Sequence, residues 1–242
     1  MVLVIDIGNS FCKVALMNSF QVENVQVYPH DQLIQETQNL LLTSATSSIA
    51  ICSVHHSIDP FLEHFSDLHE VFIVENDLKL PFKNLYKSKT LGNDRISLAA
   101  GALTQLEKEQ AALIIDAGTC ITYDYLDNES SYHGGAISPG LNMRFQALHT
   151  FTSKLPLVSA TTNPSTVGNT TIKSIQSGVQ NGIAMEIDAM IEYYLDKENR
   201  LKVFLTGGDS ELLSIQLKNR FFADSNLTLR GIYNLYLTNK KI

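Results

Sequence analysis

Residues 113–122 read Leu-Ile-Ile-Asp-Ala-Gly-Thr-Cys-Ile-Thr, and this stretch decides the fold. Its apolar start predicts a buried strand that ends in a carboxylate, a glycine and a hydroxyl residue, before a return strand. The same design opens the chain, where residues 2–10 read Val-Leu-Val-Ile-Asp-Ile-Gly-Asn-Ser. One copy alone is typical of a plain hairpin turn. Two copies indicate that the architecture itself is doubled.

Each of these turns has the chemistry to bind phosphate and a cation. The glycine can take a positive φ and lets another group approach the backbone. The backbone N–H groups, with the side chains of Asn9, Ser10 and Thr119, can face a phosphate. Asp6 and Asp116 are placed to hold a cation, directly or through water. We expect both carboxylates to face a cleft between two domains that binds a ligand with several phosphates.

The composition is that of a globular protein with ample material for a core. The chain has 242 residues, of which 44% are hydrophobic and 18% charged, and a formal net charge of −7. This charge argues against nucleic-acid and anionic-membrane partners, whereas ATP needs only a local positive site. The sequence contains no apolar run near the ~20 residues of a membrane helix and shows no signal peptide, so we expect a cytoplasmic protein.

The cysteines and histidines do not indicate a metal site. Cys12, Cys52 and Cys120 lie far apart in or beside apolar strands, which is typical of buried, reduced thiols. His55 and His56 are adjacent at the end of a predicted strand, where neighbouring side chains point to opposite faces.

Both halves of the chain are predicted to begin with three strands and a helix and then to alternate. Such alternation predicts mixed sheets covered by helices, in an N-terminal domain of residues 1–108 and a C-terminal domain of residues 109–242. Residues 76–90 and 154–166 are expected to be irregular. The predicted strands are 2–7, 11–17, 21–28, 48–54, 70–74, 111–116, 119–126, 131–138, 202–206 and 227–229, and the predicted helices are 31–42, 58–65, 96–106, 139–151, 170–197, 210–218 and 231–238.

Three details of the helices follow from single residues. Pro139 suits the first turn of the helix predicted for residues 139–151. Asp209 is a good N-cap for the helix from residue 210. Gly178 and Gly182 lie one turn apart on the longest helix and permit close contact with another helix.

The doubled Asp-x-Gly turn with a late Gly-Gly is similar to the superfamily of acetate and sugar kinases, Hsp70 and actin. Within that superfamily the chain closely resembles the type III pantothenate kinases. The most specific motifs are Gly-x-Asp-Arg and Gly-Gly-x-Ile-x-Pro-Gly. The matching segments are Asp6-Ile7-Gly8-Asn9-Ser10, Gly92-Asn93-Asp94-Arg95, Asp116-Ala117-Gly118-Thr119, Gly134-Gly135-Ala136-Ile137-Ser138-Pro139-Gly140, Lys154-Leu155-Pro156, Gly168-Asn169-Thr170-Thr171, Gln176-Ser177-Gly178 and Thr206-Gly207-Gly208.

The resemblance implies a fold, an activity and an assembly. The fold would be α/β, with two tandem actin-like (ribonuclease H-like) domains, each a mixed five-stranded sheet with flanking helices. The activity would be transfer of the γ-phosphate of ATP to the 4′-hydroxyl of pantothenate, the first step of coenzyme A biosynthesis. Mg²⁺ and a monovalent cation, K⁺ or NH₄⁺, would be required, and the enzyme would be a homodimer whose substrate pocket lies near the subunit interface.

The resemblance also implies roles for single residues. Asp94 would be the general base and Arg95 would bind the pantothenate carboxylate, which a guanidinium can hold at two points. Asp6 would hold Mg²⁺ through water, and Asp116 would bind the monovalent cation. The ATP phosphates would lie against Gly8, Asn9, Ser10, Lys13, Gly118 and Thr119, the adenine against Gly207 and Gly208, and pantothenate against Gly92, Asn93, Thr171 and Tyr86.

Alternatives stay open for several of these residues. Asp94 could merely cap a helix beginning at Arg95. Lys13 could point to solvent, and Gly207 with Gly208 could form a plain strand-to-helix turn. Thr170 could share the task of Thr171, because the third position of the family's Gly-x-Asn-Thr motif differs here.

The chain departs from the family before Gly92, where Ser88 and Lys89 replace a common proline. Because this segment differs from the family pattern, the resemblance supports Tyr86 as a pocket residue less strongly than it supports Gly92, Asn93 and Thr171. Two other functions remain open for the whole chain: a non-catalytic ATP-binding regulator or scaffold, and a kinase for another small hydroxy acid.

Overall fold

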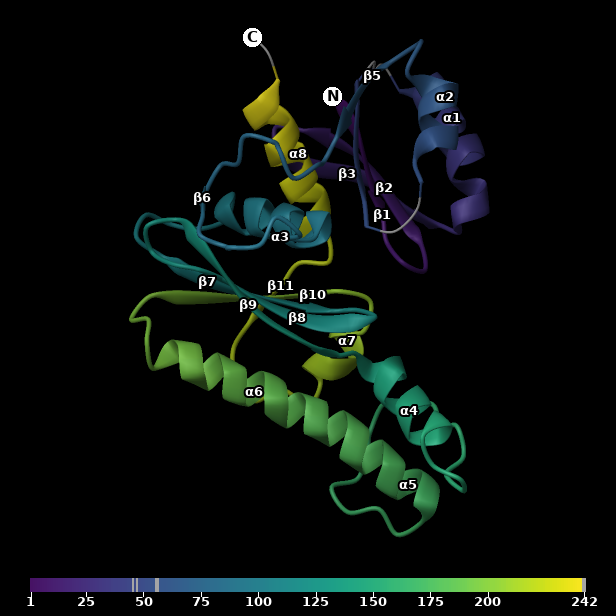
Figure 1. Ribbon diagram of the computed structural model, residues 1–242, viewed down its shortest axis with the longest axis vertical. Coiled ribbons are helices and arrows are strands. Elements are labelled where there is room, and N and C mark those ends of the chain that lie inside the picture. The colour runs from purple at the N-terminus through teal and green to yellow at the C-terminus, as the bar shows by residue number, and fades with distance from the viewer. Residues whose placement is uncertain (45, 47, 55–56, 241–242) are drawn as a thin grey trace. The chain divides into compact units, whose positions relative to one another are not determined.

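The computed structural model describes residues 1–44, 46, 48–54 and 57–240, so His55 and His56 lie outside the described residues. Two compact units make up the chain (Figure 1). The first comprises Met1–Leu106, Ser130–Tyr132 and Asn226–Ile242, and the second Glu107–Glu129 and His133–Ser225. The expected cut after residue 108 lies close to the end of the first segment, but the C-terminal residues return to the first unit.

The sheet of the first unit has five strands in the order β3-β2-β1-β4-β5. β1 pairs antiparallel with β2 and parallel with β4, and β4 pairs parallel with β5. The strands are β1 (Val2–Ile7), β2 (Cys12–Asn18), β3 (Gln21–Tyr28), β4 (Ser48–Ser53) and β5 (Glu70–Ile73). These strands confirm the sequence-based prediction to within one residue at each end.

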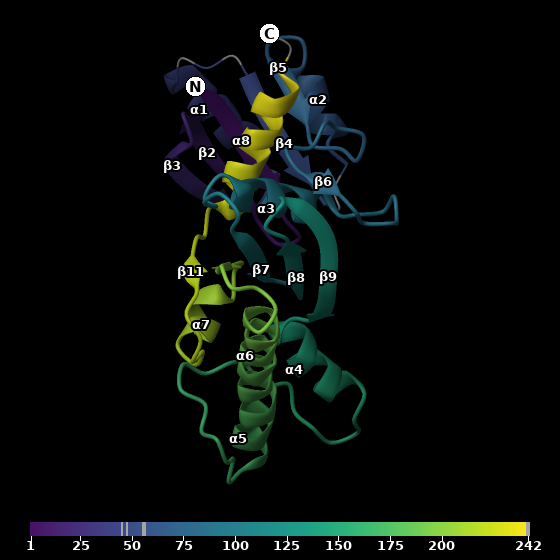
Figure 2. The same ribbon diagram turned by 90° about the vertical axis from the view of Figure 1, so that its left-hand side faces the viewer.

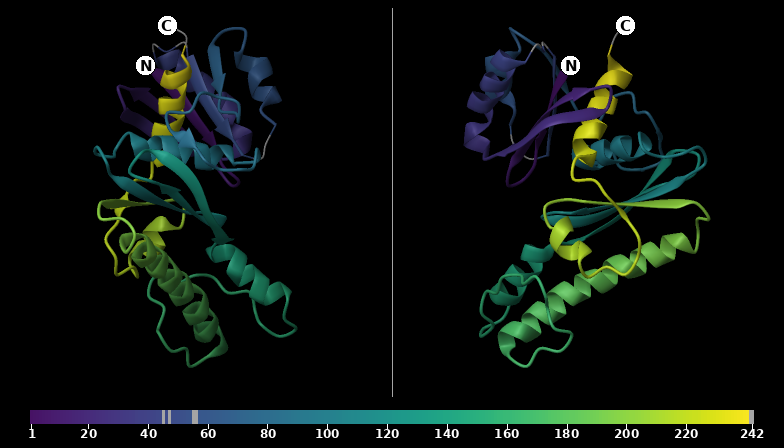
Figure 3. Two further views of the ribbon diagram at one scale, coloured as in Figure 1. Left: turned by 60° about the vertical axis from the view of Figure 1, so that its left-hand side comes forward. Right: turned by 180° about the vertical axis from the view of Figure 1, so that it is seen from behind.

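Helices cover both faces of this sheet (Figures 1 and 3). On one face Leu3, Ile5 and Ile7 form a cluster with the apolar residues of α1 (Leu33–Thr43) and α2 (Asp59–Phe65). On the other face lie α3 (Asn93–Leu103) and α8 (Leu227–Asn239). Because side chains alternate along a strand, Asp6 shares a face with Val2 and Val4. That is the face covered by α3, which carries Asp94.

The sheet of the second unit repeats the order of the first. Its strands run β11-β10-β7-β8-β9, and β6, whose residues belong to the first unit, is paired beyond β9. β7 pairs antiparallel with β8 and parallel with β10, as β1 does with β2 and β4. The strands are β7 (Ala111–Ala117), β8 (Cys120–Leu126), β9 (Ser131–Pro139), β10 (Leu201–Thr206), β11 (Phe222–Ala223) and β6 (Lys83–Asn84), the last pairing with the first residues of β9. The doubled architecture is confirmed, with two mixed sheets of five and six strands.

One face of the second sheet packs against α4 (Leu141–Thr150) and α6 (Gly182–Leu195), as Figure 2 shows. Leu113, Ile115 and Ala117 of β7 join the apolar residues of these helices in one buried cluster. The predicted helix of residues 170–197 is interrupted. It consists of α5 (Thr171–Gln176), a π-helical turn, Ser177–Asn181, and α6.

Several of the sequence-based expectations were wrong. Pro139 ends β9, and α4 begins only at Leu141. Asp209 stands at the N-cap position of the short α7 (Ser210–Ser214) but makes no side-chain cap bond. A Cβ atom on Gly178 or Gly182 would have no neighbour within 4 Å among the described residues, so these glycines mark open space and not a helix contact.

The strand expected at residues 227–229 was also wrong, because these residues form the first turn of α8. The Leu-Thr-Leu alternation resembles a strand, but Leu227, Leu229 and Ile232 are all buried in a helix that packs on α3. Packing in the first unit therefore overrides local propensity. Among the described residues, no helix is long and apolar enough to cross a membrane.

Candidate active site

The first candidate cluster joins the end of β1 to its neighbours in the first unit. Asp6 lies opposite Lys13 on β2 and beside Cys52 on β4. Burial raises the pKa of Asp6 to about 6, the Lys13 ammonium opposes this shift, and the Asp94 carboxylate adds to it. Asp6, Lys13 and Asp94 therefore form one electrostatic group.

The turn after β1 is tight but not left-handed. The N–H of Gly8 donates to the carbonyl oxygen of Phe11 at 3.1 Å. Gly8 and Gly118 do not have positive φ angles, so that part of the expectation was wrong. A Cβ atom on Gly8 would lie 3.3 Å from the Phe11 oxygen, so the absence of a side chain lets the backbone of Gly8 come close to that of Phe11. Asn9 and Ser10 at the tip are exposed and accessible to a phosphate.

His30 is a residue of this site that sequence reasoning missed. Its Nε2 lies 2.8 Å from the carbonyl oxygen of Gly8, and the carbonyl must accept the hydrogen bond. The imidazole thereby supports the turn from outside. His30 lies 22 residues from Gly8 along the chain, and no pattern in the sequence indicates that the two residues are in contact.

Asp94 lies in the first turn of α3, whose N-cap is Gly92. Its Oδ1 accepts the N–H of Arg95 at 2.8 Å. The helix begins at Asn93 and its N-cap makes no side-chain bond, so Asp94 is not the cap of a helix beginning at Arg95. The carboxylate stands within the turn, half-buried and close enough to Asp6 to affect its pKa.

Arg95 and Tyr86 lie together. The Arg95 guanidinium carbon is 5.7 Å from the centre of the Tyr86 ring, and the Arg95 side chain is buried. A cation over an aromatic face is stabilised by the ring quadrupole. Despite the altered segment before Gly92, Tyr86 thus lies beside the arginine of the Gly-x-Asp-Arg motif.

The second candidate cluster gathers around Asp116 at the end of β7. Asp116 lies opposite Thr122 on β8 and Thr206 on β10. Gly207 has a φ of +96°, and a Cβ atom there would lie 2.4 Å from both the Ala117 oxygen and Asp116 Oδ1. The Gly-Gly after β10 is therefore packed onto the Asp116 turn.

A third glycine closes this turn from the β9–α4 side. Gly140 donates its N–H to the Thr119 oxygen at 3.1 Å, and a Cβ atom on it would lie 2.3 Å from the Gly118 oxygen. Thr119 is exposed at the tip. A Cβ atom on Gly208 would meet no described atom within 4 Å, which leaves the side of the turn at Gly208 open.

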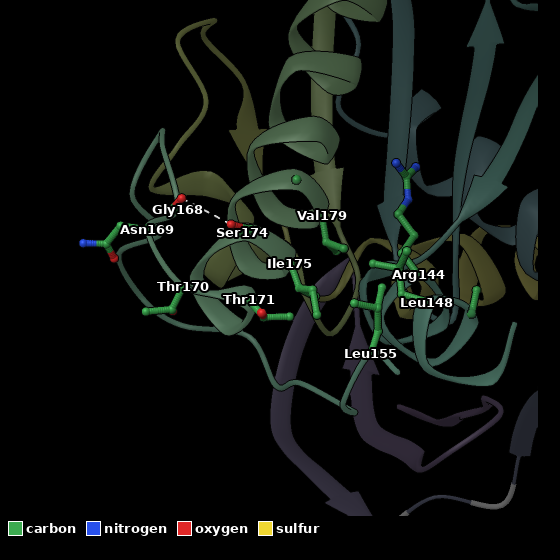
Figure 4. Close-up of a pocket in the computed structure, with 12 residues that line it drawn as sticks. Arg144, Leu148, Leu155, Gly168, Asn169, Thr170, Thr171, Ser174, Ile175 and Val179 are labelled. Carbon is green, nitrogen blue, oxygen red and sulfur yellow. Dashed lines mark hydrogen bonds between the residues drawn. The ribbon is translucent and has the colours of Figure 1, made fainter. Parts of the chain in front are cut away.

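Thr171 does not belong to either cluster but to a pocket of about 1060 Å³ in the second unit. In Figure 4, Ile175 and Val179 project toward Leu148 and Leu155, while Asn169 points away. The lining combines apolar side chains with hydroxyl groups. Its residues are Arg144, Ala147, Leu148, Leu155, Gly168, Asn169, Thr170, Thr171, Ser174, Ile175, Gly178 and Val179.

Arg144 at the rim belongs to a hydrogen-bonded network. Its guanidinium donates to Glu186 at 2.6 Å, to Ser138 at 2.8 Å and to the Pro139 carbonyl oxygen at 2.8 Å. Tyr123 donates to the other Glu186 oxygen at 2.9 Å. These bonds outweigh burial and lower the pKa of Glu186. The network fixes the start of α4, one wall of the pocket.

The cysteines, histidines and carboxylates are also candidate ligands for a metal ion. No group of three or more His, Cys, Asp or Glu among the described residues could hold a metal ion. Cys12, Cys52 and Cys120 are free, the first two buried and the third half-buried. Burial raises the pKa of the Cys12 and Cys52 thiols, so both are protonated.

Comparison with known proteins agrees with the resemblance seen in the sequence. The family model for type III pantothenate kinase matches residues 2–193. A type III pantothenate kinase from Flavobacterium psychrophilum is 39% identical over 242 residues, covering 99% of this chain and 100% of the relative.

Solved structures show the fold alone. A Campylobacter jejuni protein described as a conserved member of the Baf family of transcriptional activators has a TM-score of 0.63 at 23% identity, covering 98% of both chains. A glucokinase from an Antarctic psychrotroph has a TM-score of 0.50 at 13% identity, covering 96% of this chain and 97% of its own. With a family match over most of the chain and a full-length relative, the chain belongs to the type III pantothenate kinase family.

Proposed function

We propose that the protein transfers the γ-phosphate of ATP to the 4′-hydroxyl of pantothenate, the first step of coenzyme A biosynthesis. The observation that carries this proposal is the Gly92–Arg95 motif at the start of α3. There a half-buried carboxylate lies close to the carboxylate of Asp6 and beside a buried arginine. A base, a site for the phosphates and an anchor for a carboxylate are the three groups this reaction needs.

Asp94 is the proposed general base. Phosphoryl transfer passes through a loose transition state, so the protein mainly positions groups and stabilises charge. A carboxylate that accepts the substrate hydroxyl proton contributes typically ~10²–10⁴-fold. Arg95 is proposed to bind the pantothenate carboxylate at two points, with Tyr86, Gly92 and Asn93 beside it.

Asp6 is proposed to hold Mg²⁺ through water, with Lys13 facing the phosphates. The residues fit this ion, because Mg²⁺ usually binds one or two protein carboxylates together with substrate phosphates. Mg²⁺ bound there would offset the burial that disfavours the ionised carboxylate. When bound, Mg²⁺ supplies neutralisation of the charge that develops on the transferring phosphate. The remaining phosphate contacts are assigned to Gly8, Asn9 and Ser10.

The turn of the second unit is proposed to bind a nucleotide and a cation with the same chemistry. Asp116 would bind K⁺ or NH₄⁺, and Gly118 and Thr119 would contact phosphate. Gly207 and Gly208 would border the adenine. Support comes from the equivalent positions of Asp6 and Asp116 in the two sheets.

In the second unit, the pocket that contains Thr171 is proposed to contact pantothenate. The molecule combines a dimethyl group with hydroxyl and amide groups. The pocket offers Leu148, Leu155 and Ile175 beside the hydroxyls of Thr170 and Thr171. Such a mixture of apolar walls and a few polar groups is typical of small-molecule sites.

We propose a homodimer with the pocket near its interface. Several apolar side chains of the second unit are strongly exposed, among them Phe151 at 85%, Val167 at 81% and Met185 at 62%. Exposed apolar surface of this kind marks interaction sites. A Met185→Glu variant should then shift the mass measured by light scattering from dimer toward monomer, whereas a wild-type monomer would contradict the proposal.

The deciding experiment measures ADP release with ATP, Mg²⁺ and pantothenate, with and without K⁺ or NH₄⁺. We expect pantothenate-dependent turnover that needs the monovalent cation and falls by about 10²-fold or more in Asp94→Asn. Unchanged turnover in Asp94→Asn would remove Asp94 as base but leave the activity. ATP binding without turnover would favour the non-catalytic regulator, and turnover only with other hydroxy acids would favour a different substrate.

We expect the enzyme to work in the cytoplasm.

A further inference from the structure

Residues 154–170, which connect α4 to α5, are held by side chains of the helix that follows them. This segment, here called the tethered loop, has no helix or strand of its own. Backbone groups of such a segment need other partners. Helix side chains bind four of its carbonyl oxygens: Gln176 that of Ser159 at 2.9 Å, Ser177 that of Thr166 at 2.7 Å, Asn181 that of Ser165 at 3.1 Å and Ser174 that of Gly168 at 3.2 Å.

The fifth and central tether is Gln180, which is fully buried. Its amide oxygen accepts the Thr161 N–H at 2.9 Å, and its amide nitrogen donates to the Thr161 oxygen at 2.7 Å. One side chain thus satisfies both backbone groups of one loop residue. Because the amide is buried, loss of either bond would leave a polar group unpaired in the interior.

Gln180 lies in the π-helical turn, Ser177–Asn181, that separates α5 from α6. Ser177 and Asn181, which also hold the loop, belong to the same turn. Single π-helical turns inside α-helices often accompany functional sites. Here the irregular turn gathers three loop-binding side chains.

The tethered loop forms part of the pocket at both of its ends. Leu155 near its start and Gly168 to Thr170 at its end line the pocket. Figure 4 shows these two ends on different sides of the α5 helix, with Ser174 bonded to Gly168. Thr161, which Gln180 grips, lies between the two ends in sequence. Val158, three residues before it, is buried in the core cluster of the second unit.

We propose that Gln180 is a positioning residue for the substrate pocket: it fixes the tethered loop and thereby the placement of Leu155 and of the Gly168–Thr170 wall. The inference rests on the proposed function in taking pantothenate as the pocket's ligand. Gln180 does not line the pocket itself, so it acts through the loop.

The test compares Gln180→Met and Gln180→Glu with the wild-type, full-length protein. Methionine fills the space without either bond, so the KM for pantothenate should rise about 10-fold, equivalent to one or two lost neutral hydrogen bonds. The KM for ATP should stay unchanged. The matched control is Gln146→Met on α4, an exposed glutamine whose amide binds only the Thr150 hydroxyl at 3.3 Å among the described contacts.

Gln180→Glu supplies a readout that a merely structural role would not produce. A protonated carboxyl can accept from the Thr161 N–H and donate to its oxygen, as the amide does, whereas the ionised form cannot donate. The pantothenate KM of this variant, relative to wild type, should therefore be near one at low pH and rise with pH. A ratio that does not change with pH overturns the proposal, as does a Gln180→Met variant with an unchanged pantothenate KM.

Hydrogen exchange separates this inference from the proposed function. Amide protection across residues 157–165 should fall in Gln180→Met and not in Gln146→Met. Unchanged protection overturns the tether whatever the substrate is. A wild-type enzyme that does not phosphorylate pantothenate, with the tether confirmed by exchange, overturns only the proposed function and with it the identity of the ligand.

Discussion

A Cβ atom on Gly92 would lie 2.4 Å from Oδ1 of Asp94, the same oxygen that accepts the N–H of Arg95 at 2.8 Å. The missing side chain of Gly92 therefore leaves the space that the Asp94 carboxylate occupies. The glycine has a φ of −61°, so its left-handed freedom is not the reason for its presence.

Gly92→Ala should displace the proposed base without unfolding the protein. A misplacement near 1 Å can cost about 10²-fold, so kcat should fall by about 10- to 100-fold while the melting temperature changes little. In a double-mutant cycle with Asp94→Asn the two losses should not add, because both act on one carboxylate. Additive losses would show that Gly92 acts elsewhere.

Asp6 should make stability depend on pH. Its pKa rises from 3.8 to about 6 in the folded protein, so the folded state binds the proton more tightly than the unfolded state. The stabilisation is complete below pH 3.8 and is lost as pH rises to about 6. Asp6→Asn should therefore be more stable than wild type above pH 6, by about 2–3 kcal/mol at most.

Thermal melts of both proteins from pH 4 to 8, without nucleotide, measure this effect. The melting temperature of Asp6→Asn minus that of the wild type should increase between pH 4 and 6 and then stay constant. Mg²⁺ with ATP should narrow it by stabilising only the wild type. A difference independent of pH would mean that Asp6 is not buried as a titrating carboxylate.

The crossing of α3 and α8 should be intolerant of side chains at two glycines. A Cβ atom on Gly101 would lie 2.2 Å from the Leu227 oxygen, and one on Gly231 would lie 1.6 Å from the Ser97 oxygen. Overpacking of this kind costs typically about 1–3 kcal/mol, so Gly101→Ala and Gly231→Ala should both lower the midpoint of urea unfolding. Gly182→Ala is the control: it has open space in a helix and should be neutral or stabilising by about 0.5–1 kcal/mol.

His30→Phe should weaken nucleotide binding specifically. It removes the hydrogen bond to the Gly8 carbonyl and should raise the KM for ATP about 2- to 10-fold, with the KM for pantothenate unchanged. His30→Gln keeps a donor of similar reach and should restore the ATP KM. An equal rise in both KM values would show a general loss of structure.

Most of the longer strands could be predicted from the sequence because apolar runs and turn residues are local signals, whereas the short β6 and β11 were missed. Val2–Ile7 and Ala111–Ala117 are buried on both faces, and such runs have few other readings in a globular chain. The helix ends were harder: Asn93 rather than Ile96 begins α3, since the turn of Asp94 is helical although its residues are polar. That Asp6 and Asp94 lie close together could not be predicted, because it depends on which face of the first sheet α3 covers.

The sequence by itself determined the doubled sheet, the turns at Asp6 and Asp116 and the family to which the motifs belong. Only the tertiary structure decided the supports of those motifs: His30 on the Gly8 turn, Gly207 against Asp116, Gln180 on the tethered loop and α8 on α3. The physical reason is the separation along the chain over which each kind of interaction acts. Period and turn chemistry act between neighbours in sequence, whereas these contacts join residues far apart in sequence and depend on which atoms packing leaves within a few ångströms.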